Sequence, residues 1–231
     1  MRGLRHLGLL AAFALGSTLY AAAEPLILVT TASTEPFSYY DKETGEIVGT
    51  EIDIAREAAA ALGRTLEVRI LSFPELLPAV ADGRADIAAS GITITPGRRK
   101  TVDFTIPYTT EGGIFLYKSK DRMPSMGNIR MMKELKIGTM DASTYDFFLT
   151  SHGVDPLRYE FYDDAVRDLK AGKLDTVFYD SCTVHITAAQ SNGEFAFSRL
   201  ETREPFGFAV EKGNEALREA LNAQITARRL K

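Results

Sequence analysis

Residues 83–90 read GRADIAAS, and residues 172–180 read GKLDTVFYD. Both stretches follow a predicted helix and run from a glycine through a basic residue, any residue and an aspartate into an apolar strand. The first strand ends at Ser90 and the second at Asp180. In open α/β sheets, ligands bind beyond the carboxyl ends of such strands. The repeat predicts two α/β lobes whose strand ends face each other across a cleft; chance similarity of one helix–strand junction is the alternative.

The segments around the repeat have the periodicities of strands and helices. Short apolar, β-rich runs indicate buried strands, and apolar residues recurring on one face indicate amphipathic helices. One helix start carries Ser72 and Glu75 at capping-box spacing. The predicted strands are 26–30 and 66–71, and the predicted helices are 51–62, 72–81, 164–171 and 214–227.

Two further apolar runs, 113–118 (GIFLYK) and 206–212 (FGFAVEK), are interpreted as connections between the lobes. A chain that crosses to a second lobe and returns has a double hinge, which permits closure around a ligand. We expect the first lobe to comprise residues 24–112 plus 208–231. The second lobe is then 113–207, including the hinge crossings.

Composition excludes several classes of protein. The chain has 231 residues, of which 45% are apolar and 25% charged, so it is expected to fold around a core. Its net charge is −4, and its longest basic run is Arg98-Arg99-Lys100. Nucleic acid is therefore not expected as a partner, since phosphate binding needs a positive face.

The first 23 residues are typical of a secretory signal peptide. Arg2 and Arg5 precede an uncharged stretch over 7–20, and three alanines then offer an A-x-A cleavage pattern before Glu24. A membrane anchor is the alternative, but a spanning helix needs about 20 apolar residues. The only cysteine, Cys182, is far from this site and cannot carry a lipid there. We therefore expect release into a bacterial periplasm, as a monomer.

Motifs for catalysis are scarce. The three histidines are far apart, and the sequence contains no H-E-x-x-H, G-x-S-x-G, P-loop or G-x-G-x-x-G pattern. Cys182 is interpreted as a small hydrophobic residue rather than a nucleophile. We expect no catalytic residue, no metal and no cofactor.

The stretch over 90–105, SGITITPGRRKTVDFT, closely resembles the S-G-M-T-I-T-P-E-R-x-x-x-V-D-F-S segment of the periplasmic amino-acid-binding proteins of ABC importers, the family 3 extracellular solute-binding proteins. The resemblance implies a type II periplasmic-binding-protein fold, with two lobes that are each a mixed sheet flanked by helices, joined by a double-strand hinge. It also implies a receptor that captures an amino acid and delivers it to an ABC transporter permease in the inner membrane. Further matching segments are 35–37, 49–55, 137–138, 143–144, 175–180 and 205–210.

The same resemblance implies roles for individual residues. Arg98 matches the arginine that binds the ligand's α-carboxylate, for which a guanidinium is suited because two parallel N–H···O bonds form at once. A solvated surface arginine is the alternative. Asp180 matches the aspartate that receives the α-ammonium. Ser90, Gly91 and Thr93 are expected to add hydroxyl and backbone partners on the Arg98 side. Ser143 and Thr144 match second-lobe residues that complete the carboxylate site, at an expected helix N-terminus.

The side-chain end of the implied site departs from the family pattern. Phe73 matches an aromatic residue that packs on the ligand, with core packing as the alternative. Thr34 stands where a second aromatic residue is usual, and Thr31 where relatives that bind basic amino acids place an acid. These departures weaken the prediction of a cationic ligand, although Asp141 and Glu35 offer negative charge.

An enzyme on the same scaffold is the alternative function. Cyclohexadienyl dehydratases, which act on prephenate or arogenate, resemble these receptors but carry a glutamate one helical turn after the second-lobe aspartate. Thr183 stands at that position, so the acid that would assist loss of hydroxide is missing. A sensor domain of a kinase or channel is disfavoured, because no later stretch is long or apolar enough to span a membrane.

Overall fold

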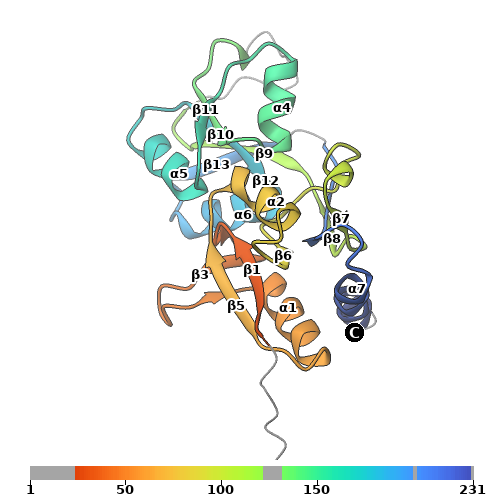
Figure 1. Cartoon of the computed structure of the whole chain (residues 1–231). Helices are drawn as coiled ribbons and strands as arrows, with labels where there is room; N and C mark the ends of the chain where they lie inside the picture. The colour runs from red at the N-terminus through yellow and green to blue at the C-terminus, as the bar shows by residue number, and fades with distance from the viewer. Residues whose placement is uncertain (1–23, 122–131, 200–201, 230–231) are drawn as a thin grey trace, which may run out of the picture.

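The computed structural model describes residues 24–121, 132–199 and 202–229. The predicted signal peptide lies outside the described residues. No helix within these three ranges has the length and apolar character that crossing a membrane requires. The elements form two lobes, one above the other in Figure 1.

The first sheet has five strands in the order β5-β1-β6-β15-β7. Its strands β1, β5 and β6 are parallel, whereas β15 runs antiparallel to both of its neighbours. A separate three-stranded sheet, β2-β3-β4, is formed by the residues that follow β1 in the sequence. The bounds are β1 Leu26–Thr30, β2 Ser33–Thr34, β3 Ser38–Tyr40, β4 Ile47–Val48, β5 Leu66–Ile70, β6 Ile87–Ala88, β7 Asp103–Phe104 and β15 Ala209–Val210.

The second sheet has the order β11-β10-β12-β9-β13 and is also mixed. Its strands β10, β11 and β12 are parallel, and β9 runs antiparallel to β12 and β13. The predicted fold class is therefore confirmed. The bounds are β9 Gly113–Lys118, β10 Ile137–Met140, β11 Leu157–Tyr159, β12 Thr176–Asp180 and β13 Phe195–Arg199.

The helices cover both faces of each sheet. On β1, Leu26 and Leu28 join the core under α1 and α7, whereas Val29 packs under α2 on the other face. On β9, Leu116 faces α5 and α6, and Phe115 faces α4. We call the first sheet with α1, α2 and α7 the first lobe, and the second sheet with α4, α5 and α6 the second lobe. The bounds are α1 Thr50–Ala61, α2 Phe73–Ala81, α4 Thr144–Ser151, α5 Tyr162–Lys170, α6 Ser181–Gln190 and α7 Glu215–Arg229.

The crossings between the lobes differ from the prediction. A two-stranded antiparallel sheet, β8 (Thr109–Glu111) with β14 (Glu204–Phe206), links them. The run 113–118 is instead β9, inside the second sheet, and most of 206–212 lies in or beside β15 of the first. Most of each run is apolar because it is buried in a sheet, whereas the hinge strand β8 is polar and partly exposed. The first residue of the second run, Phe206, is the buried end of the other hinge strand, β14. The lobe boundaries 24–112 plus 208–231 and 113–207 stay a prediction.

The sequence repeat corresponds to equivalent strands. β6 and β12 are each the third strand of a five-stranded sheet, between a parallel and an antiparallel neighbour. The aspartate before each strand has the same role. Asp86 Oδ2 accepts a hydrogen bond from the Ile27 backbone N–H, and Asp175 Oδ2 accepts one from the Lys136 N–H, both at 2.7 Å. The repeat is thus structural, because each aspartate anchors the strand next to its own.

Helix α1 begins one residue earlier than predicted, at Thr50, with Gly49 as its N-cap. Gly49 has φ 125° and ψ 173°, a region essentially restricted to glycine. A Cβ there would lie 2.3 Å from the Phe37 carbonyl oxygen. This close backbone approach fixes the start of the helix.

We expect Gly49→Ala to lower the free energy of unfolding by more than about 3 kcal/mol, because backbone strain and a backbone clash combine. Gly63→Ala is the matched control. Its φ is also positive, at 70°, but a Cβ there meets no atom within 4 Å, so we expect a loss of only about 1 kcal/mol. Urea unfolding of both variants tests this, and equal losses would contradict it.

Candidate functional site

The polar groups that end β6 and β12 meet between the lobes. Ser90 and Gly91 follow β6, and Asp180 is the last residue of β12. A Cβ on Gly91 would lie 3.4 Å from Asp180 Oδ2, and the φ of Gly91 is 60°. The loop backbone therefore faces the carboxylate directly, as expected for strand ends that face each other.

Arg98 belongs to the first lobe, like Ser90 and Gly91, and lies in the 3₁₀ turn Arg98–Lys100. Its Nη1 donates to the Thr93 carbonyl at 2.9 Å, and its Nη2 reaches across the lobes to the Ala142 carbonyl at 3.3 Å. Burial lowers the pKa of Arg98 to about 10, against the opposing effect of Glu204 and Asp180. The guanidinium is therefore still charged at neutral pH, and its five N–H donors exceed what two carbonyls use.

Phe73 begins α2 and lies under the guanidinium, with the Arg98 Cζ 5.4 Å from its ring centroid. This ring is only partly buried and packs against core residues of both lobes. It thus holds Arg98 in place by a cation–π contact. The predicted packing on a ligand and the alternative core packing both remain compatible with this position.

Two predicted threonines meet across the cleft. Thr93 Oγ1 and Thr144 Oγ1 share a hydrogen bond of 3.3 Å, and Thr144 is the first residue of α4. Ser143 is the N-cap of that helix, and its Oγ accepts from the Asp146 N–H at 3.1 Å. The positive end of α4 therefore points to the side where Arg98 lies, which favours an anion there.

Asp180 is almost fully buried, with 4% of its surface exposed. Tyr145 Oη donates to its Oδ1 at 2.7 Å. Burial raises the pKa of Asp180 well above its usual value, and the carboxylates of Glu111, Glu204 and Glu51 raise it further, while Tyr145 opposes the rise. An ionised carboxylate here is costly unless a cation pairs with it.

This pKa shift predicts how stability depends on pH. Folding raises the pKa of Asp180, so the stability that the group contributes is fully present below the unfolded value of about 3.9. That contribution is lost as the pH rises through the folded pKa. In the unliganded protein we expect Asp180→Asn to match the wild type near pH 4 and to equal or exceed its stability at pH 8. Urea unfolding at both values tests this, and a variant less stable than the wild type at pH 8 would contradict it.

The other predicted residues form a group of hydroxyls. Thr34 Oγ1 shares hydrogen bonds of 3.1 Å with Ser90 Oγ and with Tyr179 Oη, and Ser90 Oγ shares one of 2.6 Å with Thr31 Oγ1. Thr34 therefore contacts a second-lobe aromatic residue that the sequence analysis did not single out. The only signal for Tyr179 was its place directly before Asp180.

Glu51 is a second residue that the sequence analysis missed. It is fully buried in the first turn of α1 and accepts hydrogen bonds from Ser38 Oγ at 2.7 Å, the Gly91 N–H at 3.1 Å and Tyr108 Oη at 2.5 Å. Burial raises its pKa, while these hydrogen bonds oppose the rise. Glu51 thus fixes the loop that faces Asp180.

A sequence profile of the bacterial extracellular solute-binding proteins, family 3, matches residues 26–230. The chain belongs to this family. The arrangement of its two sheets and the family membership together confirm the resemblance stated from residues 90–105. A solute-binding protein rather than an enzyme was expected, and this is also confirmed. Burial raises the pKa of Cys182 to about 12, which leaves its thiol protonated and unreactive.

Named relatives of this family 3 protein cover nearly its whole length. The L-arginine-binding protein of Pseudomonas aeruginosa is 31% identical over 99% of this chain and 92% of its own length. The arginine-bound form of truncated ArgBP from T. maritima has a TM-score of 0.81 and 29% identity, covering 89% of this chain and 96% of that one. An ancestral arginine-binding protein bound to glutamine has the same TM-score and identity, with 90% and 92% coverage.

Proposed function

We propose that this family 3 protein is a periplasmic receptor that holds a free amino acid between its lobes and delivers it to the permease of an ABC importer. The observation that carries this proposal is the pair of groups on the two lobes, the partly buried guanidinium of Arg98 and the buried carboxyl group of Asp180. Arg98 takes the α-carboxylate, assisted by the N-terminus of α4. Asp180 takes the α-ammonium, whose charge offsets the cost of burying an ionised carboxylate.

Such a ligand drives closure because it binds both lobes at once. A ligand stabilises the closed form only by its differential affinity for that form, and contacts to a single lobe would be present in both forms. Movement about the hinge strands β8 and β14 then brings Gly91 against Asp180. The site lies within one chain, which supports a monomer. The predicted signal peptide and the extracellular family support a periplasmic location.

The ligand is a free amino acid in this proposal, and arginine and glutamine head the test panel. Both are named as bound molecules of solved relatives. The test is a thermal-shift screen over the twenty amino acids. An amino acid that binds should stabilise the fold by about 2.7 kcal/mol at about one hundred times its own dissociation constant. For a domain of this size the melting temperature should then rise by roughly 5–10 °C.

Agmatine, which is arginine without its α-carboxylate, is the matched control and should give no shift. A shift with agmatine equal to that with arginine would contradict the role of Arg98. No shift with any amino acid would contradict the proposed function itself.

A further inference from the structure

A line of buried hydroxyls crosses from one lobe to the other. Thr31, Ser90 and Thr34 belong to the first lobe and are linked by hydrogen bonds of 2.6 and 3.1 Å. Tyr179, on β12 of the second lobe, continues the line through its 3.1 Å hydrogen bond to Thr34. The final hydrogen bond exists only while the lobes are together, because its two atoms come from different lobes.

Tyr179 is held firmly on its own side. Its ring stacks on that of Tyr162, with centroids 4.4 Å apart and planes inclined by 24°. It is 4% exposed. Burial and the nearby Asp180 raise the pKa of Tyr179 well above its usual value, so the hydroxyl keeps its proton. The group presented to Thr34 is therefore a rigid, neutral donor and acceptor.

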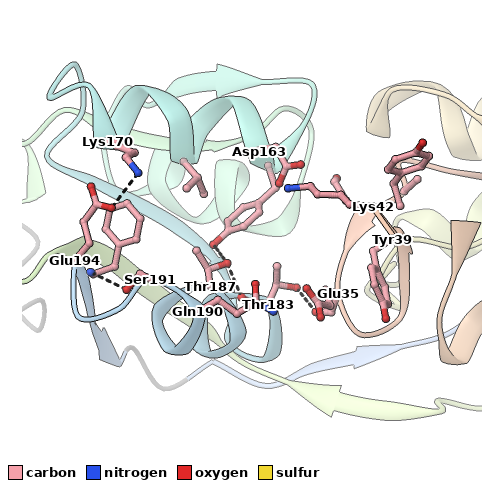
Figure 2. A pocket seen from close by; sticks show the side chains of 16 residues that line it. Glu35, Tyr39, Lys42, Asp163, Lys170, Thr183, Thr187, Gln190, Ser191 and Glu194 are labelled. Carbon is pink, nitrogen blue, oxygen red and sulfur yellow. Dashed lines mark hydrogen bonds and ion pairs between the residues drawn. The ribbon is translucent and has the colours of Figure 1, made fainter. Parts of the chain in front are cut away.

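The lobes are incompletely packed on this side of the molecule. A cavity of about 450 Å³ lies between the β2–β3 hairpin of the first lobe and helices α5 and α6 of the second. Figure 2 shows the side chains that line it. At the edge of this cavity Thr183 Oγ1 donates to the Glu35 carbonyl at 2.8 Å, another hydrogen bond between the lobes (Figure 2). Where a cavity replaces apolar packing, direct hydrogen bonds have a larger share in holding the lobes together.

We propose that Tyr179 is a positioning residue for the receptor site: its hydroxyl, through Thr34, stabilises the closed form and so raises the affinity for every ligand that closes the lobes. This inference rests on the proposed function. Tyr179 shifts the equilibrium between the open and closed forms, and it affects the affinity for a ligand only through that equilibrium. A shift in a closure equilibrium multiplies all affinities by one common factor, whereas loss of a direct contact changes each ligand differently.

The chain offers a matched control in Tyr162. Tyr162 and Tyr179 stack on each other and are 3% and 4% exposed. The Tyr162 hydroxyl also makes a 3.1 Å hydrogen bond, but its partner is Thr187, in the same lobe. Removing either hydroxyl leaves the ring in place. Only removal of the Tyr179 hydroxyl breaks a hydrogen bond between the lobes.

The test is titration calorimetry of the mature protein with L-arginine and L-glutamine. We expect Tyr179→Phe to weaken each amino acid that the wild type binds by about three- to tenfold, by the same factor for both. Tyr162→Phe should change affinity less than twofold. In a double-mutant cycle, adding Thr34→Val to Tyr179→Phe should cost less than Thr34→Val costs alone, because the shared hydrogen bond is already gone.

A loss below twofold in Tyr179→Phe, an equal loss in Tyr162→Phe or an additive cycle would overturn the proposal. If the wild type binds no amino acid, the proposed function fails, and the role of Tyr179 is then decided without ligand. Small-angle scattering of the unliganded proteins should give a larger radius of gyration for Tyr179→Phe than for the wild type and Tyr162→Phe. Equal radii would overturn the inference in that case.

Discussion

Arg98→Ala should lower the affinity for the best amino acid of the panel at least a hundredfold. The guanidinium is partly buried, lies over the Phe73 ring and donates hydrogen bonds to carbonyls of both lobes. Its removal leaves a ligand carboxylate desolvated without its partner. Losing one side of a buried charge pair costs on the order of 3–5 kcal/mol, against about 0–1 kcal/mol for an exposed pair. Each 1.4 kcal/mol corresponds to about a tenfold change in affinity.

Titration calorimetry measures this effect, and two variants sharpen it. Arg98→Lys keeps the charge but loses the planar pair of donors, so its affinity should fall between those of the wild type and Arg98→Ala. Arg99→Ala removes the exposed neighbouring arginine and should leave affinity within about twofold. A change under about threefold for Arg98→Ala would place this residue outside the site.

Asp180→Asn should also lower affinity at least a hundredfold, because a neutral amide cannot offset the charge of a buried α-ammonium. Unlike most losses of function at buried positions, this one should come without a loss of stability. In the wild type, Tyr145 Oη lies 2.7 Å from the Asp180 carboxylate. The amide oxygen of the variant can still accept this hydrogen bond, and the cost of burying a charged group disappears.

The control for this variant is Asp163→Asn. Asp163 is an exposed acid of the second lobe, at the edge of the cavity in Figure 2. Its removal should change affinity less than twofold, since exposed charges are screened. Retention of affinity in Asp180→Asn, measured by the same titration, would undo the assignment of the ammonium site.

Much of the architecture could be predicted because its signals are local. The glycine, basic residue and aspartate before β6 and β12 lie within a few positions of the strand that they set up, and Ser72 and Glu75 cap α2 as their spacing predicts. Strands such as β9 and β12 are buried at most or all positions, so their apolar runs indicate a sheet without indicating which sheet. The runs 113–118 and 206–212 were assigned to the hinge for that reason.

The unpredicted parts depend on contacts between distant residues. The hydrogen bond from Tyr179 to Thr34 spans 145 positions, and Glu51 meets Gly91 and Tyr108 at separations of 40 and 57. No periodicity in the chain encodes such pairs. The hinge strand β8 was also missed, because its sequence, Thr-Thr-Glu, has no apolar pattern to detect.

The place of β15 in the first sheet has a consequence for the order of folding. β15 lies between β6 and β7 and pairs with both, yet it follows the whole second lobe in the chain. During synthesis, every strand of the second sheet is complete before the first sheet can fill the gap between β6 and β7. The second lobe is therefore able to form its core early, from neighbouring segments. The first lobe has to wait, with an open sheet edge, for the last part of the chain to emerge.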